Sequence, residues 1–138
     1  MTTWIAGQTD RFAAIVSGVP VTDLISFYGT SDIGHYFAPF EMGCQPWEDR
    51  ERYVRMSPLT YADRVVTPML LIHHAQDLRC PIAQSEQFYT TLKALGREVE
   101  FLRVDDASHG IVPPSRAHAE LIDLEAAHDW FGRYLDLA

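Results

Sequence analysis

The sequence predicts an α/β fold with about three parallel strands and flanking helices. Two short apolar runs, residues 12–20 and 67–74, alternate along the chain with segments of helical pattern. A third strand pattern, EVEFLRV at 98–104, comes before a final helical segment. Strands separated by helices pair in parallel, and such sheets are covered by helices on both faces. The order of the elements therefore gives the fold class.

The first half of the chain is the less regular one. Residues 2–8 resemble the end of a helix, and FAAIVSGVP, closed by Gly18 and Pro20, is typical of a buried strand. A short helix and a turn-rich stretch, VTDLISFYGTSDIG, come next. Residues 35–56 mix aromatics, two prolines and a charged helical piece, so we expect an irregular segment. Most aromatics here are interpreted as a minor core, with the lining of a substrate pocket as the alternative.

The second half is more regular. SPLTYADRV begins with Ser57 and a proline, which suits the N-cap and first position of a short helix. TPMLLIHH is the second buried strand. PIAQSEQFYTTLKALG predicts a helix, with Pro81 in its first turn, Gly96 at its end and one apolar face formed by Phe88, Leu92 and Leu95. The final helix, 117–135, has an apolar stripe at heptad-like spacing: Leu121, Leu124, His128, Phe131 and Leu135.

Composition limits the binding partners and the cellular compartment that we expect for the chain. The 138 residues suit one domain, the net charge is −8, and Lys93 is the only lysine, which excludes a phosphate-binding surface and nucleic acid. No run reaches the roughly 18 apolar residues that cross a bilayer, and MTTWIAGQTDRF is unlike a signal peptide. Cys44 and Cys80 are too few for a disulfide framework. We expect a cytoplasmic protein with reduced thiols and no membrane partner.

Two polar residues lie at expected strand ends. Asp77 follows the second strand, and His109, in DDASHG, follows the third. Ligands bind beyond the carboxyl ends of strands in open α/β sheets, and a carboxylate there can orient an imidazole as in a catalytic triad. The order Asp then His is that of the α/β-hydrolases, whose nucleophile comes earlier. The alternatives are that Asp77 caps a helix or forms a turn, and that His109 lies in a simple turn.

A metal site is the weaker interpretation of these polar residues. His73, His74, Asp77 and His109 are residue types that bind zinc. Adjacent strand residues point to opposite faces, however, so His73 and His74 cannot both ligate one ion from a regular strand. We expect at most one of these two histidines to face the core, and we expect no metal and no cofactor.

Several longer stretches are similar to a known family. TDRFAAIVS, SFYGTSDIG, SPLTYADRV, TPMLLIHHAQDLRCPIAQSEQFYTTLKALG and DASHG followed by WFGRYL resemble the catalytic domain of prolyl oligopeptidase family serine peptidases, and most of all its acylaminoacyl-peptidase branch. The resemblance runs from about Met1 to Leu135. It implies a partial α/β-hydrolase fold and, in the complete enzyme, the cleavage of short peptides without a cofactor.

The resemblance also implies roles for individual residues. Asp77 corresponds to the triad acid and His109 to the general base. Arg79 corresponds to a position whose guanidinium contacts a substrate carbonyl, and a salt bridge at the end of the sheet is the alternative. Cys80 corresponds to a position near the specificity pocket, and simple packing is its alternative.

The chain departs from the family pattern at the nucleophile. The family places its serine in a G-x-S-x-G elbow, and no serine here has those flanking glycines: the serines are Ser17, Ser26, Ser31, Ser57, Ser85, Ser108 and Ser115. We therefore expect residues 1–138 to be the C-terminal portion of a catalytic domain, with the elbow and any propeller domain outside them. The chain alone is expected to be inactive.

The same expectation bears on folding and partners. About three strands of a larger sheet would leave an open edge, so we expect the chain to be marginally stable, to self-associate or to depend on an N-terminal half. Two other functions stay open. One is a non-catalytic binding or assembly module derived from an α/β-hydrolase. The other is part of an esterase-like α/β-hydrolase.

Overall fold

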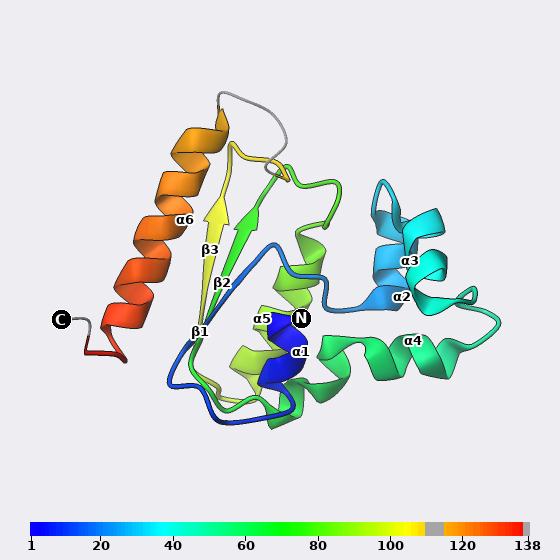
Figure 1. The fold of residues 1–138 in the computed structure, drawn as a ribbon, viewed down its shortest axis with the longest axis horizontal. Coiled ribbons are helices and arrows are strands. Elements are labelled where there is room, and N and C mark those ends of the chain that lie inside the picture. Colours follow the sequence, from blue (N-terminus) through cyan, green and yellow to red (C-terminus); the bar gives the residue numbers. More distant parts are fainter. Residues whose placement is uncertain (110–114, 137–138) are drawn as a thin grey trace.

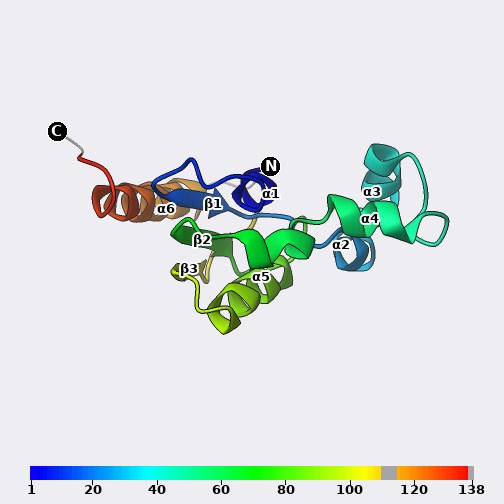
Figure 2. The same ribbon diagram turned by 90° about the horizontal axis from the view of Figure 1, so that it is seen from below.

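A computed structural model describes residues 1–109 and 115–136 of the chain. Three parallel strands form one sheet in the order β1-β2-β3: β1 (Ile15–Gly18), β2 (Met69–His74) and β3 (Val99–Val104). Helix α6 (Ser115–Gly132) lies on one side of this sheet, while α1 (Thr2–Ala6) and α5 (Ala83–Ala94) lie on the other (Figures 1 and 2). The predicted α/β class, with about three parallel strands and flanking helices, is confirmed.

The middle strand is the best covered. Register pairs Met69 of β2 with Ile15 on one side and Val99 on the other. Every residue of β2 is buried. Within the described residues β1 pairs with β2 alone, so it is an edge strand, and it is shorter than the predicted run because only four residues join the ladder.

Alternation along β2 builds two separate cores. Met69 and Leu71 pack against Phe88 and Leu92 of α5. Leu70 and Ile72 face the other way and belong to the cluster that contains Trp130 of α6. Because period-2 alternation continues to the end of the strand, His73 faces the α5 side and His74 the α6 side. Both histidines are buried, so the prediction that at most one faces the core is wrong.

A small helical lobe stands beside the sheet (Figure 1). It comprises α2 (Leu24–Thr30), α3 (Gly34–Met42) and α4 (Arg50–Met56), and the 3₁₀ helix η1 (Pro58–Arg64) leads from it back to β2. The prediction that residues 35–56 are irregular is wrong for α3. Pro39 lies inside this helix, and Gly43, with φ 72°, ends it in the left-handed conformation that glycine favours.

Ser57 is the N-cap residue of η1 and Pro58 follows at its first position, as predicted, but the Ser57 hydroxyl makes no capping bond: it accepts from the Leu24 amide and donates to the Tyr53 carbonyl. The prediction that most aromatics here form a minor core is wrong. The minor core contains Phe27 and Tyr53. Most aromatics of the segment are exposed instead of forming that core: Tyr36, Phe37, Phe40 and Trp47.

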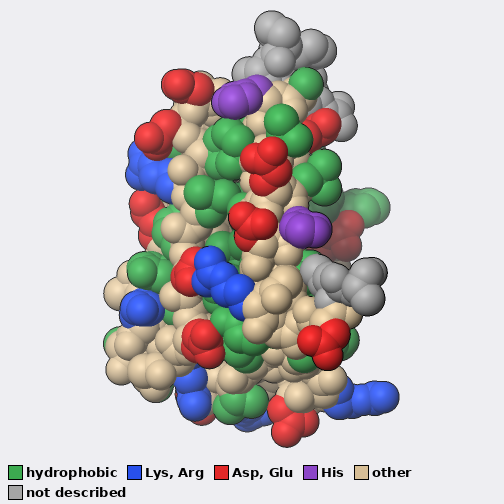
Figure 3. Space-filling view, turned by 90° about the vertical axis from the view of Figure 1, so that its left-hand side faces the viewer, with side chains coloured by type: hydrophobic (Ala, Val, Ile, Leu, Met, Phe, Trp, Pro, Cys, Tyr) green, Lys and Arg blue, Asp and Glu red, His purple; other side chains and the backbone are tan. Residues whose placement is uncertain are grey.

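The predicted apolar stripe of the last helix is wrong except for Phe131, which packs against the cluster that contains Trp130. Leu124 is 69% exposed, and Leu121, His128 and Leu135 are exposed too. The side chains that face the sheet follow a different row, Ala119, Ile122, Ala126 and Trp130. Figure 3 shows the outer face of the molecule on this side, where hydrophobic and acidic side chains are interspersed. Leu95 likewise lies outside the apolar face of α5, beyond its last residue.

No helix of the described residues is both long and apolar enough to span a membrane.

Candidate active site

The candidate site lies at the carboxyl ends of β2 and β3, at the top of Figure 1. A turn directly after β2 carries Asp77, Arg79 and Cys80, and the segment after β3 carries His109. A backbone hydrogen bond joins the two segments: the Gln76 amide donates to the Ala107 carbonyl at 3.0 Å. The four residues singled out from the sequence therefore lie on two adjacent segments.

Asp77 uses its two carboxylate oxygens for different purposes. Oδ1 accepts hydrogen bonds from the backbone amides of Arg79 (2.9 Å) and Cys80 (2.8 Å), which closes the turn after β2. Oδ2 lies 2.8 Å from Nδ1 of His109. The carboxylate is buried. The two interpretations of Asp77, turn former and orienting acid, are therefore compatible, because one oxygen serves each.

His109 is held by Asp77 and remains partly open to solvent. Its side chain is 30% exposed, whereas the carboxylate against its Nδ1 is fully buried. A carboxylate at Nδ1 holds the proton on that nitrogen and so fixes the ring in one orientation and one tautomer. Nε2 is then the nitrogen suited to accepting a proton from another group.

Arg79 forms an ion pair at the rim of the site. Its Nε donates to Oδ1 of Asp32 at 2.7 Å and its Nη2 to Oδ2 at 3.3 Å, a two-pronged contact. This hydrogen bond raises the pKa of Arg79 and lowers the pKa of Asp32. The salt bridge weighed as an alternative for Arg79 is present.

The turn between α2 and α3 is hydrogen-bonded to the turn that carries Asp77, the acid-bearing turn. Asp32 pairs with Arg79 through its side chain, and the backbone amide of Asp32 donates to the Leu78 carbonyl at 2.9 Å. The Ser31 hydroxyl donates to the Arg79 carbonyl at 2.6 Å. The helical lobe is thus fastened to the site by backbone and side-chain bonds at once. Sequence reasoning missed Ser31 and Asp32, because nothing in a loop 45 or more residues upstream signals this contact.

Cys80 packs between the site and the helical lobe. It is half-buried against the cluster of Phe27 and Tyr53. Burial, with the Asp77 carboxylate as a smaller cause, raises the pKa of its thiol to about 12. The sulfur is therefore a protonated, weakly polar group at neutral pH and no nucleophile.

The two strand histidines bind different partners on opposite faces. His73 contacts the Ser85 hydroxyl and the Cys80 carbonyl, each at 2.7 Å. His74 contacts the Ser108 carbonyl at 2.6 Å and Asp123 at 3.1 Å. Among the described residues there is no group of three or more His, Cys, Asp or Glu side chains placed to hold a metal ion.

Comparison with known proteins places this geometry in a family. The sequence model of the prolyl oligopeptidase family matches residues 1–138. The chain belongs to the prolyl oligopeptidase family. This is a family of serine peptidases, and the resemblance noted from the sequence motifs is confirmed.

Individual relatives support the same assignment. The chain is 39% identical over 135 residues to an uncharacterized peptidase, YuxL, of Bacillus subtilis, covering 98% of this chain and 20% of that protein. It is 30% identical to an acylamino-acid-releasing enzyme of Arabidopsis thaliana, covering 99% of this chain and 19% of that protein. The solved acylaminoacyl peptidase of Pyrococcus horikoshii superimposes with a TM-score of 0.90 at 35% identity, covering 99% of this chain and 22% of that one. The chain thus spans about a fifth of the relatives it matches.

Proposed function

We propose that residues 1–138 supply the acid and the general base of a serine peptidase active site that acts on short, N-terminally blocked peptides. In this proposal Asp77 is the acid and His109 the base. The observation that carries it is the 2.8 Å contact between Oδ2 of Asp77 and Nδ1 of His109. A buried carboxylate in that position stabilises the imidazolium that forms when Nε2 takes a proton from a nucleophile.

The nucleophile is proposed to come from a segment outside these residues. No serine of the chain lies in a G-x-S-x-G sequence. The elbow also gives a backbone amide to the oxyanion hole, so the chain alone would lack two parts of the machinery. Loss of a triad nucleophile costs about 10⁶ in turnover in a well-studied protease. We accordingly propose that the chain is inactive by itself.

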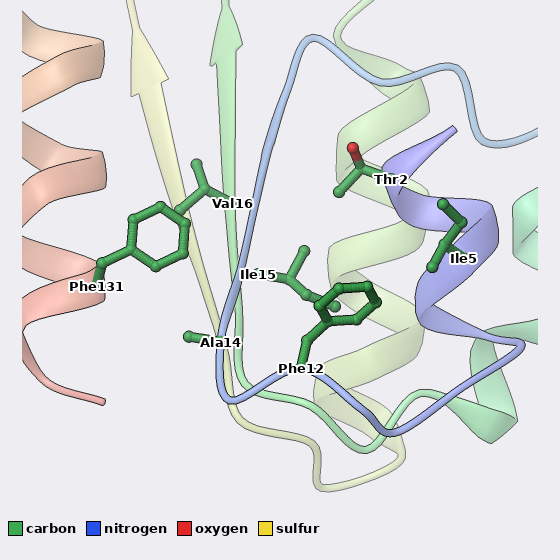
Figure 4. A pocket seen from close by; sticks show the side chains of 7 residues that line it. All are labelled: Thr2, Ile5, Phe12, Ala14, Ile15, Val16 and Phe131. Carbon is green, nitrogen blue, oxygen red and sulfur yellow. The ribbon is translucent and has the colours of Figure 1, made fainter. Parts of the chain in front are cut away.

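The open edge of β1 is the proposed place where the rest of the sheet attaches. Beside this edge lies an apolar groove lined by Phe12, Val16, Ile5 and Phe131, which come from both sides of the strand (Figure 4). The amides of Ile15 and Val19 point to β2, so by alternation the amide of Val16 points to the open side. Edge strands of parallel sheets are normally paired or covered. An added strand would bury both the groove and this donor, and self-association is the competing outcome.

Arg79 and Cys80 are proposed to contact substrate from the rim. Asp32 neutralises and orients the guanidinium of Arg79, which leaves it suited to a neutral carbonyl instead of a free carboxylate. The support for the substrate class is the relatives, among which are an acylamino-acid-releasing enzyme and an acylaminoacyl peptidase.

A labelling experiment tests the proposal. A chimera is made in which residues 1–138 replace the matching segment of the Pyrococcus horikoshii acylaminoacyl peptidase, and both chimera and isolated chain are treated with a fluorophosphonate probe. The chimera should be labelled and should hydrolyse acyl-peptides faster than simple esters, and the isolated chain should not be labelled. Labelling of the isolated chain at one of its own serines would refute the proposal, and a preference for esters would favour an esterase.

A further inference from the structure

His73 and His74, the last two residues of β2, each hold one of the two loops of the candidate site. His73 reaches the acid-bearing turn through the Cys80 carbonyl at 2.7 Å. His74 reaches the base-bearing segment, residues 105–109, through the Ser108 carbonyl at 2.6 Å. The two rings do so from opposite faces of the sheet, because neighbouring strand residues alternate. Two adjacent residues of β2 thus contact the acid-bearing turn and the base-bearing segment.

The chemistry of the His73 contacts defines a neutral ring. A carbonyl only accepts, so Nε2 carries the proton toward Cys80, and Nδ1 accepts from the Ser85 hydroxyl. Burial lowers the pKa of this imidazole, which agrees with a neutral tautomer. His73 thus connects Ser85 of α5 with the turn that carries Asp77.

The His74 contacts are of a different kind. Nδ1 donates to the Ser108 carbonyl, and Nε2 faces a carboxylate oxygen of Asp123 on α6 at 3.1 Å. The other oxygen of Asp123 is buried and has no hydrogen-bond partner within residues 1–109 and 115–136. His74 therefore connects three elements: β2, the segment that carries the base, and α6.

Three successive residues of the base-bearing segment are tied to the end of β2 and its turn. Ala107 accepts from the Gln76 amide at 3.0 Å, Ser108 accepts from His74, and His109 contacts Asp77 at 2.8 Å. The first tie is backbone only, and the third is the acid–base pair itself. The middle tie depends on a side chain at position 74 and would be lost with most other residues there.

We infer that His74 is a positioning residue for His109, with Asp123 as the anchor that fixes the His74 ring. Holding the Ser108 carbonyl sets the position of the next residue and so keeps Nδ1 of His109 against Asp77. This inference gives His109 its place within the function proposed above, on which it rests. Its test reads the His109–Asp77 contact directly, so a failure of peptidase activity and a failure of this inference are separate results.

The experiment compares three substitutions of His74 in the 138-residue chain. His74→Asn keeps a donor near the Nδ1 position and can hold Ser108, whereas His74→Gln places its donor near the Nε2 position, toward Asp123. His74→Phe removes both bonds at similar volume. His128→Phe is the matched control, since His128 is exposed on α6.

Three NMR signals follow the site and the fold separately. The downfield Nδ1 proton of His109 reports its bond to Asp77, and amide exchange of Gln76 reports the tie to Ala107. The Leu92 amide in the core helix α5 reports global stability. Phe and Gln at position 74 should broaden or remove the His109 signal and speed Gln76 exchange about three- to tenfold, the range expected for one lost hydrogen bond, with Leu92 little changed. Asn should preserve the signal.

Each other result overturns the inference. An intact His109 signal in His74→Phe would show that position 74 does not place the base. Equal loss of the His109 signal in His74→Asn and His74→Gln would show that the bond to the Ser108 carbonyl does not position His109. Equal acceleration at Gln76 and Leu92 in both Phe and Gln variants would show a contribution to stability alone.

Discussion

Replacement of Asp77 should separate its two roles. Asp77→Asn retains one carbonyl oxygen, which can still accept from the amides of Arg79 and Cys80 and keep the turn. Its amide nitrogen then faces Nδ1 of His109, donor against donor, so the ring must change tautomer or move. Asp77→Ala removes both oxygens and leaves the two backbone amides without their acceptor.

The magnitude follows from those contacts. An unsatisfied buried donor costs about 1–3 kcal/mol, so two orphaned amides in Asp77→Ala should lower the free energy of unfolding by about 2–6 kcal/mol. That is a large share of the stability of an ordinary domain, about 5–15 kcal/mol. Asp77→Asn should lose clearly less, because it keeps the turn, yet in the chimera it should reduce turnover about 10⁴-fold, as the equivalent change does in a well-known serine protease.

Urea unfolding of the chain, with ¹⁵N NMR of the His109 ring, checks this separation. Asp77→Asn should show a modest shift in the unfolding midpoint together with a changed His109 tautomer. Asp77→Ala should show a large shift in the unfolding midpoint. If Asn and Ala destabilise the chain equally, the turn does not depend on Oδ1. If Asn leaves the His109 tautomer unaltered, Oδ2 does not orient the ring and the reasoning fails.

Three further predictions concern the thiol, the pH dependence and the open edge. Cys80, with its pKa raised to about 12, should react with iodoacetamide at pH 8 far more slowly in the folded chain than in urea, as followed by mass spectrometry; equal rates would contradict its burial. Burial lowers the pKa of His73, so as the pH falls below about 6.5 the imidazole binds a proton in the unfolded chain before it does so in the folded chain. The contribution of His73 to the free energy of unfolding is therefore fully present above that pH and is lost on acidification. Urea midpoints at pH 7.5 and 5.5 should therefore differ less in His73→Gln, which keeps a donor for Cys80, and an unchanged difference would assign the effect to other groups. Phe12→Lys, at an exposed position in the groove beside β1, should reduce self-association in sedimentation velocity, and the matched change Phe40→Lys, in the helical lobe, should not; equal effects would place the contact elsewhere.

The regular half of the fold followed from the sequence for clear physical reasons. TPMLLIHH has the continuous apolar run of a strand buried on both faces, and β2 is buried throughout. EVEFLRV alternates, and β3 is buried at its two ends and more open between them. Gly96 lies just past the end of α5, as predicted, whereas Pro81 lies two residues before the first residue of the helix, Ala83, instead of in its first turn.

The failures came where tertiary contacts override local pattern. Pro39 is tolerated in α3 although proline normally interrupts a helix. In the final helix Ala119, Ala126 and Trp130 face the sheet, whereas Leu121 and Leu124 are exposed. Periodicity alone could not choose between these rows, because both have helical spacing.

The candidate site was partly visible in the sequence. Asp77 and His109 could be placed together from their positions after two neighbouring parallel strands. Their supporting residues could not. His74 depends on a partner 49 residues away, Asp123, and Arg79 on one 47 residues away, Asp32. Such contacts exist only after the layers have packed.

The central claim is that Asp77 and His109 serve as acid and base, and the most direct measurement is acyl-peptide hydrolysis by the chimera with and without His109. His109→Ala should lower turnover by about 10⁶, the scale seen when a triad histidine is removed from a well-studied protease, while His128→Ala leaves it unchanged. A folded chimera whose turnover survives His109→Ala would contradict the account.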